Sequence, residues 1–250
     1  MTGFAGWNLF GNLAAITFTQ GLNLLLNMFF GPVVNAARGI AVQAQTAIGQ
    51  FSSNFQTALN PQITKSYATG DMEYMHGLIF RSAKFSFFLL LLLSLPVLIE
   101  TKALLTLWLK IVPDHTVVFL RIMLCTTWVY AVSNPLITAA SATGKIKLYQ
   151  SVVGGLLLLI LPISYLCLRL GLPAYSVFIV HLVIEITAQF ARLLMLKRMI
   201  KLSLREYFSK VVWCIFKVTA IALAVPQAVI YCPPQHGVWN LLMVCLVCTL

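Results

Sequence analysis

Long runs of apolar residues are the feature that most limits the folds open to this chain. The stretches "FSFFLLLLLSLPVLI" (85–99) and "SVVGGLLLLILPISYLCL" (151–168) contain no charged side chain. A helix needs about 20 mostly apolar residues to cross a bilayer. Hydrophobic segments recur at about 4–30, 33–62, 75–99, 117–142, 148–170, 174–196, 211–231 and 237–250. The pattern predicts an all-α polytopic membrane protein, a helical bundle of about eight transmembrane segments.

Charged residues are too scarce to cover a soluble domain. They make up 9% of the chain, whereas a soluble domain carries about 25%. The formal net charge is nevertheless +11. Lys and Arg collect in the cytoplasmic loops of membrane proteins, so the positive charge indicates how the chain is oriented in the membrane. We therefore expect no nucleic acid as a partner.

The positions of the basic residues predict the topology. With Met1 on the cytoplasmic side, the inner loops and helix ends hold Lys65, Arg81, Lys84, Lys145, Lys147, Lys197, Arg198, Lys201, Arg205 and Lys210. The outer loops hold Lys102, Lys110 and Arg169, with Arg121 near the edge. The positive-inside rule therefore places Met1 on the cytoplasmic side.

The breaks between segments divide the chain into three predicted parts. Residues 1–196 form a six-helix transmembrane bundle, 197–210 form a basic amphipathic segment at the cytoplasmic interface, and 211–250 form an additional C-terminal pair with a short last helix. Residues 101–115 are expected to lie at the opposite interface. No basic residue precedes Arg38 and the last run has 14 residues, so we expect a part of a longer transporter, with a half-sized protein as the alternative.

Signatures of enzyme chemistry are missing from the sequence. There is no G-x-S-x-G, H-E-x-x-H or P-loop motif. Five of the six cysteines lie inside hydrophobic runs, and the pair Cys245 and Cys248 has no histidine near it. We therefore predict no catalytic residue, no metal site and no cofactor.

One membrane-length segment is unusually polar. On a helical wheel one half of this segment collects amides, hydroxyls and a guanidinium: Asn35, Arg38, Gln43, Gln45, Thr46, Gln50, Ser52, Ser53, Asn54, Gln56, Thr57 and Asn60. Three interpretations compete: an interfacial helix, a polar face that holds helices together, and the wall of a water-filled cavity. We favour the cavity wall, because an interfacial helix carries more Lys and Arg, and packing needs fewer polar groups.

A ladder of asparagines along the first segment supports a polar cavity. Asn8, Asn12, Asn23 and Asn27 share one helical face with Thr19. Amides both donate and accept hydrogen bonds, which suits the hydroxyls of a glycan better than an apolar drug. These asparagines and the polar half of the second segment are our predicted substrate contacts.

The ionisable residues within predicted spans are functional candidates. Arg38 could contact a pyrophosphate or another anionic headgroup, since a guanidinium binds phosphate through two nitrogens; a snorkelling arginine is the alternative. His181, Glu185 and Arg192 share a face of the sixth segment and could carry protons that drive transport. The alternative is a structural cluster in which Arg192 neutralises Glu185.

Two stretches carry a family resemblance. "GPVVNAARGIAVQAQTAIGQFSSNFQTALNPQITKSYATGD", followed by "FRSAKFSFFLLLLLSLPVLI", resembles the bacterial polysaccharide flippases, which include the O-antigen and oligosaccharide-lipid flippases of the multidrug/oligosaccharidyl-lipid/polysaccharide exporter superfamily. The resemblance is most specific over residues 6–99 and looser towards the C-terminus. It implies a second bundle of a two-bundle exporter, lining half of a central cavity.

The resemblance also implies a task and partners. Such a protein moves an undecaprenyl-pyrophosphate-linked oligosaccharide to the periplasmic leaflet of the bacterial inner membrane, for polysaccharide and lipopolysaccharide biosynthesis. One bundle cannot enclose a cavity, so we expect the missing N-terminal bundle or a second copy as a partner, besides membrane lipids. The alternatives are a drug–cation antiporter of the same superfamily, a membrane-embedded glycan-assembly enzyme and an inert fragment.

Overall fold

A computed structural model describes the backbone of residues 2–230 and the side chains of most residues from 13 to 224, leaving out those of 14, 15 and 146. Every regular element in that part of the chain is a helix. The elements are α1 (Thr2–Ala68), α2 (Met72–Ile99), α3 (Thr101–Leu109), α4 (Thr116–Ala142), α5 (Ile146–Leu158), α6 (Ile160–Arg169), α7 (Ser176–Met199), α8 (Leu204–Tyr207), the π-helix η1 (Phe208–Val212) and α9 (Trp213–Ile230).

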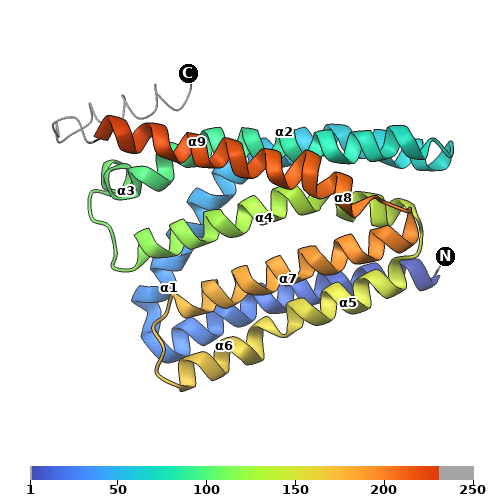
Figure 1. Cartoon of the computed structure of the whole chain (residues 1–250). Helices are drawn as coiled ribbons and strands as arrows, with labels where there is room; N and C mark the ends of the chain where they lie inside the picture. Colours follow the sequence, from blue (N-terminus) through green and yellow to red (C-terminus); the bar gives the residue numbers. More distant parts are fainter. Residues whose placement is uncertain (1, 231–250) are drawn as a thin grey trace.

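The longest helix, α1, is two arms joined by a sharp kink. Gly31 has φ 79° and ψ −178°, a combination open almost only to glycine, and Pro32 follows it. Buried residues at similar distances on either side of Gly31, such as Leu26 and Ala37, belong to the same core cluster. The first arm (2–30) and the second arm (32–68) therefore pack against each other next to the kink, and Figure 1 shows them as two blue stretches that meet there and diverge.

Six helices are long and apolar enough to cross a membrane, by length and composition, within the described residues. They are Ile16–Ala68, Met72–Ile99, Thr116–Ala142, Lys147–Arg169, Ser176–Met199 and Leu204–Ala224. The prediction of a multi-pass helical bundle is confirmed at this level. The predicted number of eight transmembrane segments is not confirmed. Two predicted segments lie in the kinked α1, and the segment at 237–250 lies outside the described residues.

The connecting loops gather at two ends of the bundle. The loops at 69–71, 143–145 and 200–203 lie at one end, together with the start of α1 (Figure 1). His76 at this end donates a hydrogen bond of 3.0 Å from Nε2 to the carbonyl of Ile200, which ties two of these regions together. We call it the basic end, because most of the basic residues that predict the cytoplasmic side lie there.

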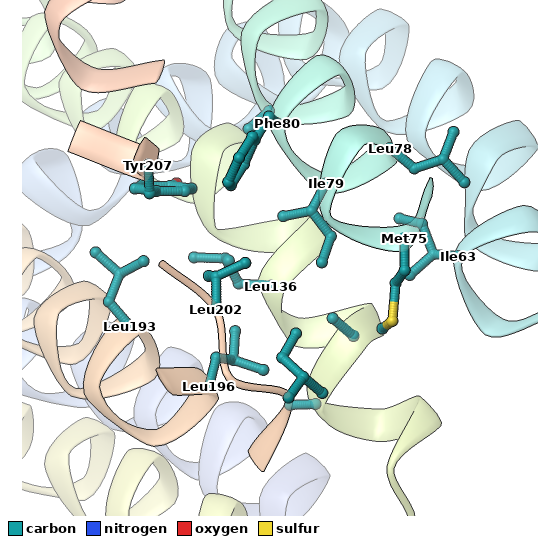
Figure 2. Packing of buried hydrophobic residues seen from close by; sticks show 14 of the residues in the cluster. Ile63, Met75, Leu78, Ile79, Phe80, Leu136, Leu193, Leu196, Leu202 and Tyr207 are labelled. Atoms are coloured by element: carbon teal, nitrogen blue, oxygen red, sulfur yellow. The ribbon is translucent and has the colours of Figure 1, made fainter. Parts of the chain in front are cut away.

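The two larger apolar clusters of the described residues form the cores that hold the helices together. Near the basic end, residues of α2, α4, α7 and α8 pack around Ile79, Leu136 and Tyr207 (Figure 2). Towards the opposite end, α1, α4 and α7 meet around Leu124, and the rings of Phe119 and Phe178 lie 4.6 Å apart. The two arms of α1 share the second core, so the hairpin is part of the bundle rather than an appendage.

The two predicted interfacial segments have different outcomes in the structure. Residues 101–109 form the short helix α3 between two spans. Residues 197–210 do not form one separate helix: α7 continues to Met199, and Ser203 caps a new helix that runs through η1 into α9. The cap explains the boundary, because its hydroxyl accepts a hydrogen bond from the amide of Glu206 at 3.3 Å.

A glycine allows the first arm to approach α6 closely. A Cβ at Gly21 would lie 2.5 Å from Cδ2 of Leu161, whereas a Cβ at Gly39 of the second arm meets nothing within 4 Å. Gly21→Leu should therefore lower the free energy of unfolding by about 1–3 kcal/mol relative to Gly39→Leu, because it overpacks this contact. Thermal unfolding in detergent measures the difference. Equal stability of the two variants would show that the arm does not pack here.

Candidate functional site: a polar stripe on the second arm of α1

Part of the polar face of α1 is used to hold helices together. Gln45 donates to the Thr127 hydroxyl at 2.7 Å, and Gln56 donates to the carbonyl of Ala131, also at 2.7 Å. Asn60 accepts from the Thr138 hydroxyl at 2.9 Å. These three bonds all join the second arm to α4. For these residues the geometry matches the second interpretation, a polar face that holds helices together. Gln45, which we predicted to line the cavity, instead joins α1 to α4.

Ser52 of the same face is buried and donates to the carbonyl of Ser86 on α2 at 3.1 Å, whereas six polar residues between 43 and 57 are exposed. They are Gln43, Thr46, Gln50, Ser53, Asn54 and Thr57, which we call the polar stripe. They cover only about 100° of the helix circumference and extend about 21 Å along it. Gln50 donates to Asn54 at 2.9 Å, within the stripe itself. Amides and hydroxyls exposed to hydrocarbon lose their hydrogen bonds with water. This face is therefore stable at membrane depth only if it contacts water or a polar partner.

A small pocket opens beside the stripe. It lies between α1, α2 and α4, has a volume of about 280 Å³, and includes Thr46, Gln50 and Ser53 of the stripe. Tyr130 of α4 lines its side. The pocket is the place where stripe residues meet an aromatic ring from another helix.

Arg38 lies between the two arms of α1. It donates a hydrogen bond from Nη1 to the Asn23 side-chain oxygen and another from Nη2 to the carbonyl of Thr19, at 3.4 Å. Its exposed fraction is 7%, and Nε is buried with no partner among the described residues. No ion pair in the described part of the chain includes Arg38. It is therefore a buried cation without a carboxylate, which is costly in a membrane.

The predicted asparagines have different surroundings. Asn23 is held by Arg38 and donates to Gln20 at 3.2 Å, whereas Asn27 is exposed. The side-chain oxygen of Asn35 is buried and has no partner among the described residues. Asn8 and Asn12 lie on the first arm, but their side chains are outside the described residues. Of the predicted row of asparagines, Asn23 therefore contacts Arg38, whereas Asn27 is exposed.

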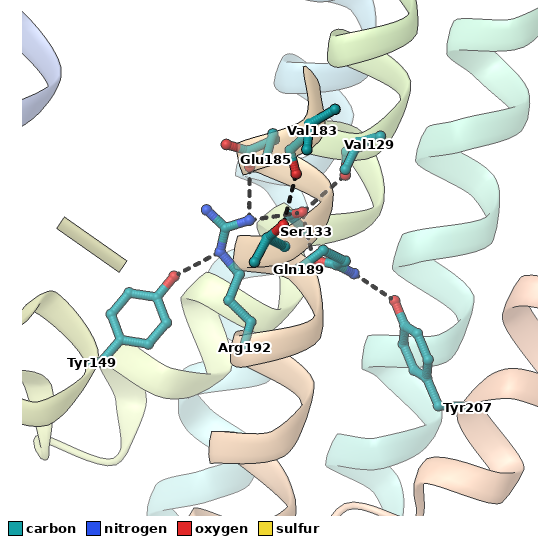
Figure 3. A network of polar contacts seen from close by, with 9 residues as sticks. Val129, Ser133, Tyr149, Val183, Glu185, Gln189, Arg192 and Tyr207 are labelled. Carbon is teal, nitrogen blue, oxygen red and sulfur yellow. Dashed lines mark hydrogen bonds and ion pairs between the residues drawn. The ribbon is translucent and has the colours of Figure 1, made fainter. Parts of the chain in front are cut away.

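A second polar cluster lies inside the bundle, between α4, α5 and α7 (Figure 3). Arg192 forms an ion pair of 2.7 Å with Glu185, and the side chains are 3% and 5% exposed. Arg192 also donates to the hydroxyls of Tyr149, at 3.2 Å, and Ser133, at 3.1 Å. Ser133 donates to Gln189 at 2.6 Å. This geometry matches the alternative to proton transport that the sequence left open, a structural cluster in which Arg192 neutralises Glu185.

His181 lies one helical turn from Glu185 on α7 but contacts a different helix. Its ring packs on Phe18 of the first arm, with centroids 4.6 Å apart. Among the described residues no hydrogen bond joins His181 to Glu185. The structure thus brings together two of the three residues predicted for proton coupling and leaves the third against α1.

Several residues of these sites were absent from the predicted set. Tyr149, Ser133 and Tyr207 complete the cluster around Arg192, and Gln189 donates to Tyr207 at 3.4 Å. Tyr130 completes the pocket beside the stripe. A hydroxyl in an apolar run is a weak signal, because it can also bond to its own helix, as Ser133 does with the carbonyl of Val129.

Comparisons with known proteins give no match to this chain: no family model, no curated protein and no solved structure. In the described part of the chain, no group of three or more His, Cys, Asp or Glu residues could hold a metal ion. The polar stripe, the pocket beside it and Arg38 are therefore the candidate site.

The buried ion pair should behave as a coupled unit. Arg192→Met leaves the Glu185 carboxylate buried and unpaired, so it should cost about 3–5 kcal/mol of unfolding free energy. The double variant Glu185→Gln with Arg192→Met should be more stable than Arg192→Met alone. Denaturant unfolding of the detergent-solubilised protein measures both values.

The exposed pair of Glu206 and Lys210 provides the control. Its atoms are also 2.7 Å apart, but the side chains are 60% exposed for Lys210 and 52% for Glu206. Lys210→Met should therefore change stability by about 0–1 kcal/mol. The interaction of Glu185 and Arg192 is tested by also measuring the single variant Glu185→Gln. If the double variant of Glu185 and Arg192 lost as much stability as Glu185→Gln and Arg192→Met added together, the two residues would not interact.

Proposed function

We propose that this chain forms one wall of a polar pathway that moves an undecaprenyl-pyrophosphate-linked oligosaccharide across the bacterial inner membrane by alternating access. The observation that carries the proposal is the exposed polar stripe on a helix of membrane-spanning composition. Polar side chains at membrane depth are tolerated where they line a water-filled cavity. The resemblance of the same segment to polysaccharide flippases supports the choice of substrate.

The chemistry of the stripe favours a glycan over a cation. All six members are neutral amides or hydroxyls, which donate and accept hydrogen bonds as sugar hydroxyls do. A drug–cation antiporter needs an acidic residue in its pathway. Glu185 is buried and paired with Arg192 at 2.7 Å, on a helix other than α1. The antiporter alternative therefore has less support.

A membrane-embedded glycan-assembly enzyme is also less supported. Such an enzyme needs a nucleophile and a general base within hydrogen-bond reach of each other. The stripe offers hydroxyls of Thr46, Ser53 and Thr57, and the Thr57 hydroxyl donates to the carbonyl of Ser53 at 2.9 Å. No histidine or carboxylate lines the pocket beside the stripe.

Arg38 is the proposed contact for the pyrophosphate. It carries a buried positive charge that no carboxylate of the described residues neutralises. Two of its five N–H donors are used by Asn23 and Thr19, so donors remain for phosphate oxygens. An anionic ligand would supply the missing negative charge. Arg38 lies on the same arm as the stripe, nearer the end opposite the basic end.

The proposed pathway needs a second wall. The stripe is exposed on the surface of this bundle, and hydrocarbon is a poor environment for its amides. We propose that a second bundle, either a further part of the same transporter or a second copy of this chain, faces it. The basic end is proposed to lie in the cytoplasm, by the positive-inside rule.

Water access to the stripe is directly measurable. In a background without the six native cysteines, Ser53→Cys should react with a water-soluble maleimide in membranes, because the proposal places it in an aqueous pathway. Val183→Cys is the matched control: Val183 is 55% exposed on α7, and it lies at a similar number of residues from the basic end. It should not react. An unreactive Ser53→Cys would contradict the pathway.

The headgroup contact is tested in cells whose surface glycan depends on this transporter. Arg38→Ala should abolish surface glycan at unchanged protein level, because the pyrophosphate loses its charged partner. Arg38→Lys should retain part of the export, since it keeps the charge but loses the two-nitrogen geometry. Arg169→Ala, at the exposed end of α6, is the control and should export normally. Normal glycan display by Arg38→Ala would remove the headgroup role.

A further inference from the structure

We infer that the pocket between α1, α2 and α4 is a binding site for one sugar ring of the transported glycan. This inference rests on the proposed function and adds a defined subsite to it, about 17 Å along α1 from Arg38. The pocket of about 280 Å³ is close to the lower limit of ordinary ligand pockets, about 300 Å³. A space of this size suits a single ring rather than a whole oligosaccharide.

Small and apolar groups make up one part of the pocket lining, which we call the floor. Gly49 lines it from α1, Leu90 from α2 and Ala131 from α4. A Cβ at Gly49 would make only an ordinary contact of 3.5 Å with Cγ2 of Thr127. The absence of a side chain at Gly49 therefore leaves the space open without being required for helix packing.

Hydrogen-bonding groups make up the rest of the lining. Gln50 and Ser53 belong to the exposed stripe, and Thr46 adds a hydroxyl. By contrast, Gln45 and Gln56 are already bonded to α4, at 2.7 Å each. The fixed amides hold the two helices at a set distance, while the stripe residues remain available to a ligand.

Tyr130 supplies the aromatic component. It lines the pocket from α4 and is 49% exposed. An aromatic ring offers an apolar face, and its hydroxyl offers a polar end. A sugar ring has C–H groups on its faces and hydroxyls around its edge, so it matches an aromatic face surrounded by amides and hydroxyls. A lipid acyl chain would use the apolar floor but none of these donors and acceptors.

The separation between the pocket and Arg38 defines how the ligand would lie. The pyrophosphate would sit at Arg38 and the glycan would extend along the second arm towards the basic end. Such a distance is bridged by a chain of several sugars rather than by the first sugar alone. The subsite would therefore recognise the oligosaccharide at a position away from its lipid link.

The test compares two lipids on the full chain in nanodiscs. One probe is undecaprenyl pyrophosphate carrying a β-1,4-linked N-acetylglucosamine tetrasaccharide, and the other is undecaprenyl pyrophosphate alone. Gly49→Leu fills the pocket, whereas Gly39→Leu, in the same arm with nothing within 4 Å, is the matched control. Tyr130→Leu removes the aromatic face, and Tyr130→Phe keeps it.

We expect the wild-type chain to bind the glycan-bearing lipid at least about tenfold more tightly than the bare lipid. Gly49→Leu and Tyr130→Leu should abolish this preference without weakening the binding of the bare lipid. Gly39→Leu should keep the preference, and Tyr130→Phe should lose less of it than Tyr130→Leu. A circular-dichroism melt of each variant reports whether the fold is retained.

The other outcomes separate the sugar subsite from the proposed function. Equal affinity of the wild-type chain for both lipids, or an unchanged preference in Gly49→Leu, overturns the subsite and leaves the Arg38 headgroup contact standing. Weaker binding of both lipids in Gly49→Leu would show that the pocket holds the lipid chain, which also overturns the subsite. No binding of either lipid by the wild-type chain would overturn the Arg38 headgroup contact and, with it, the subsite.

Discussion

The structure depends on one constraint, which is that a polar group at membrane depth must find a partner. The second arm of α1 carries more polar side chains than any other span, and it meets this constraint in two ways. Gln45 and Gln56 bond to α4, which fixes the spacing of the two helices. The stripe around Gln50 stays exposed and depends on water, ligand or a facing protein surface. The first solution gives the bundle its shape, and the second gives it a candidate task.

The same constraint explains the interior of the bundle. Glu185 is compensated by Arg192, and Arg192 in turn bonds to Tyr149 and Ser133 on two other helices. A charge brought into the core thus orders three helices at once. Removing one member leaves the others uncompensated, which makes such a cluster a strong determinant of how α4, α5 and α7 are arranged. Arg38 differs because its compensation among the described residues consists only of neutral oxygens.

The sequence alone predicted that the chain forms long apolar helices, because hydropathy depends on each segment by itself, but it did not predict that two segments join in the kinked α1. It also placed Glu185 and Arg192 on one face of a helix, and a spacing of seven residues does bring them together. The division of the polar face of α1 could not be predicted. A helical wheel gives the direction of Gln45 and Gln50 but not which neighbour lies there. Tyr149 and Tyr130 were missed for the same reason, since their partners lie far away in the sequence.

The kink at Gly31 has a mechanical consequence. A loop of several residues would let the two arms move independently, because each residue adds two soft torsions. Here the arms are joined through a single non-helical residue, and the ring of Pro32 restricts the next torsion. The angle between the two arms can therefore change only through the few torsions at this junction. The movement of the arm that carries the stripe is thus restrained by its junction with the arm that packs against α6 more closely than it would be by a loop.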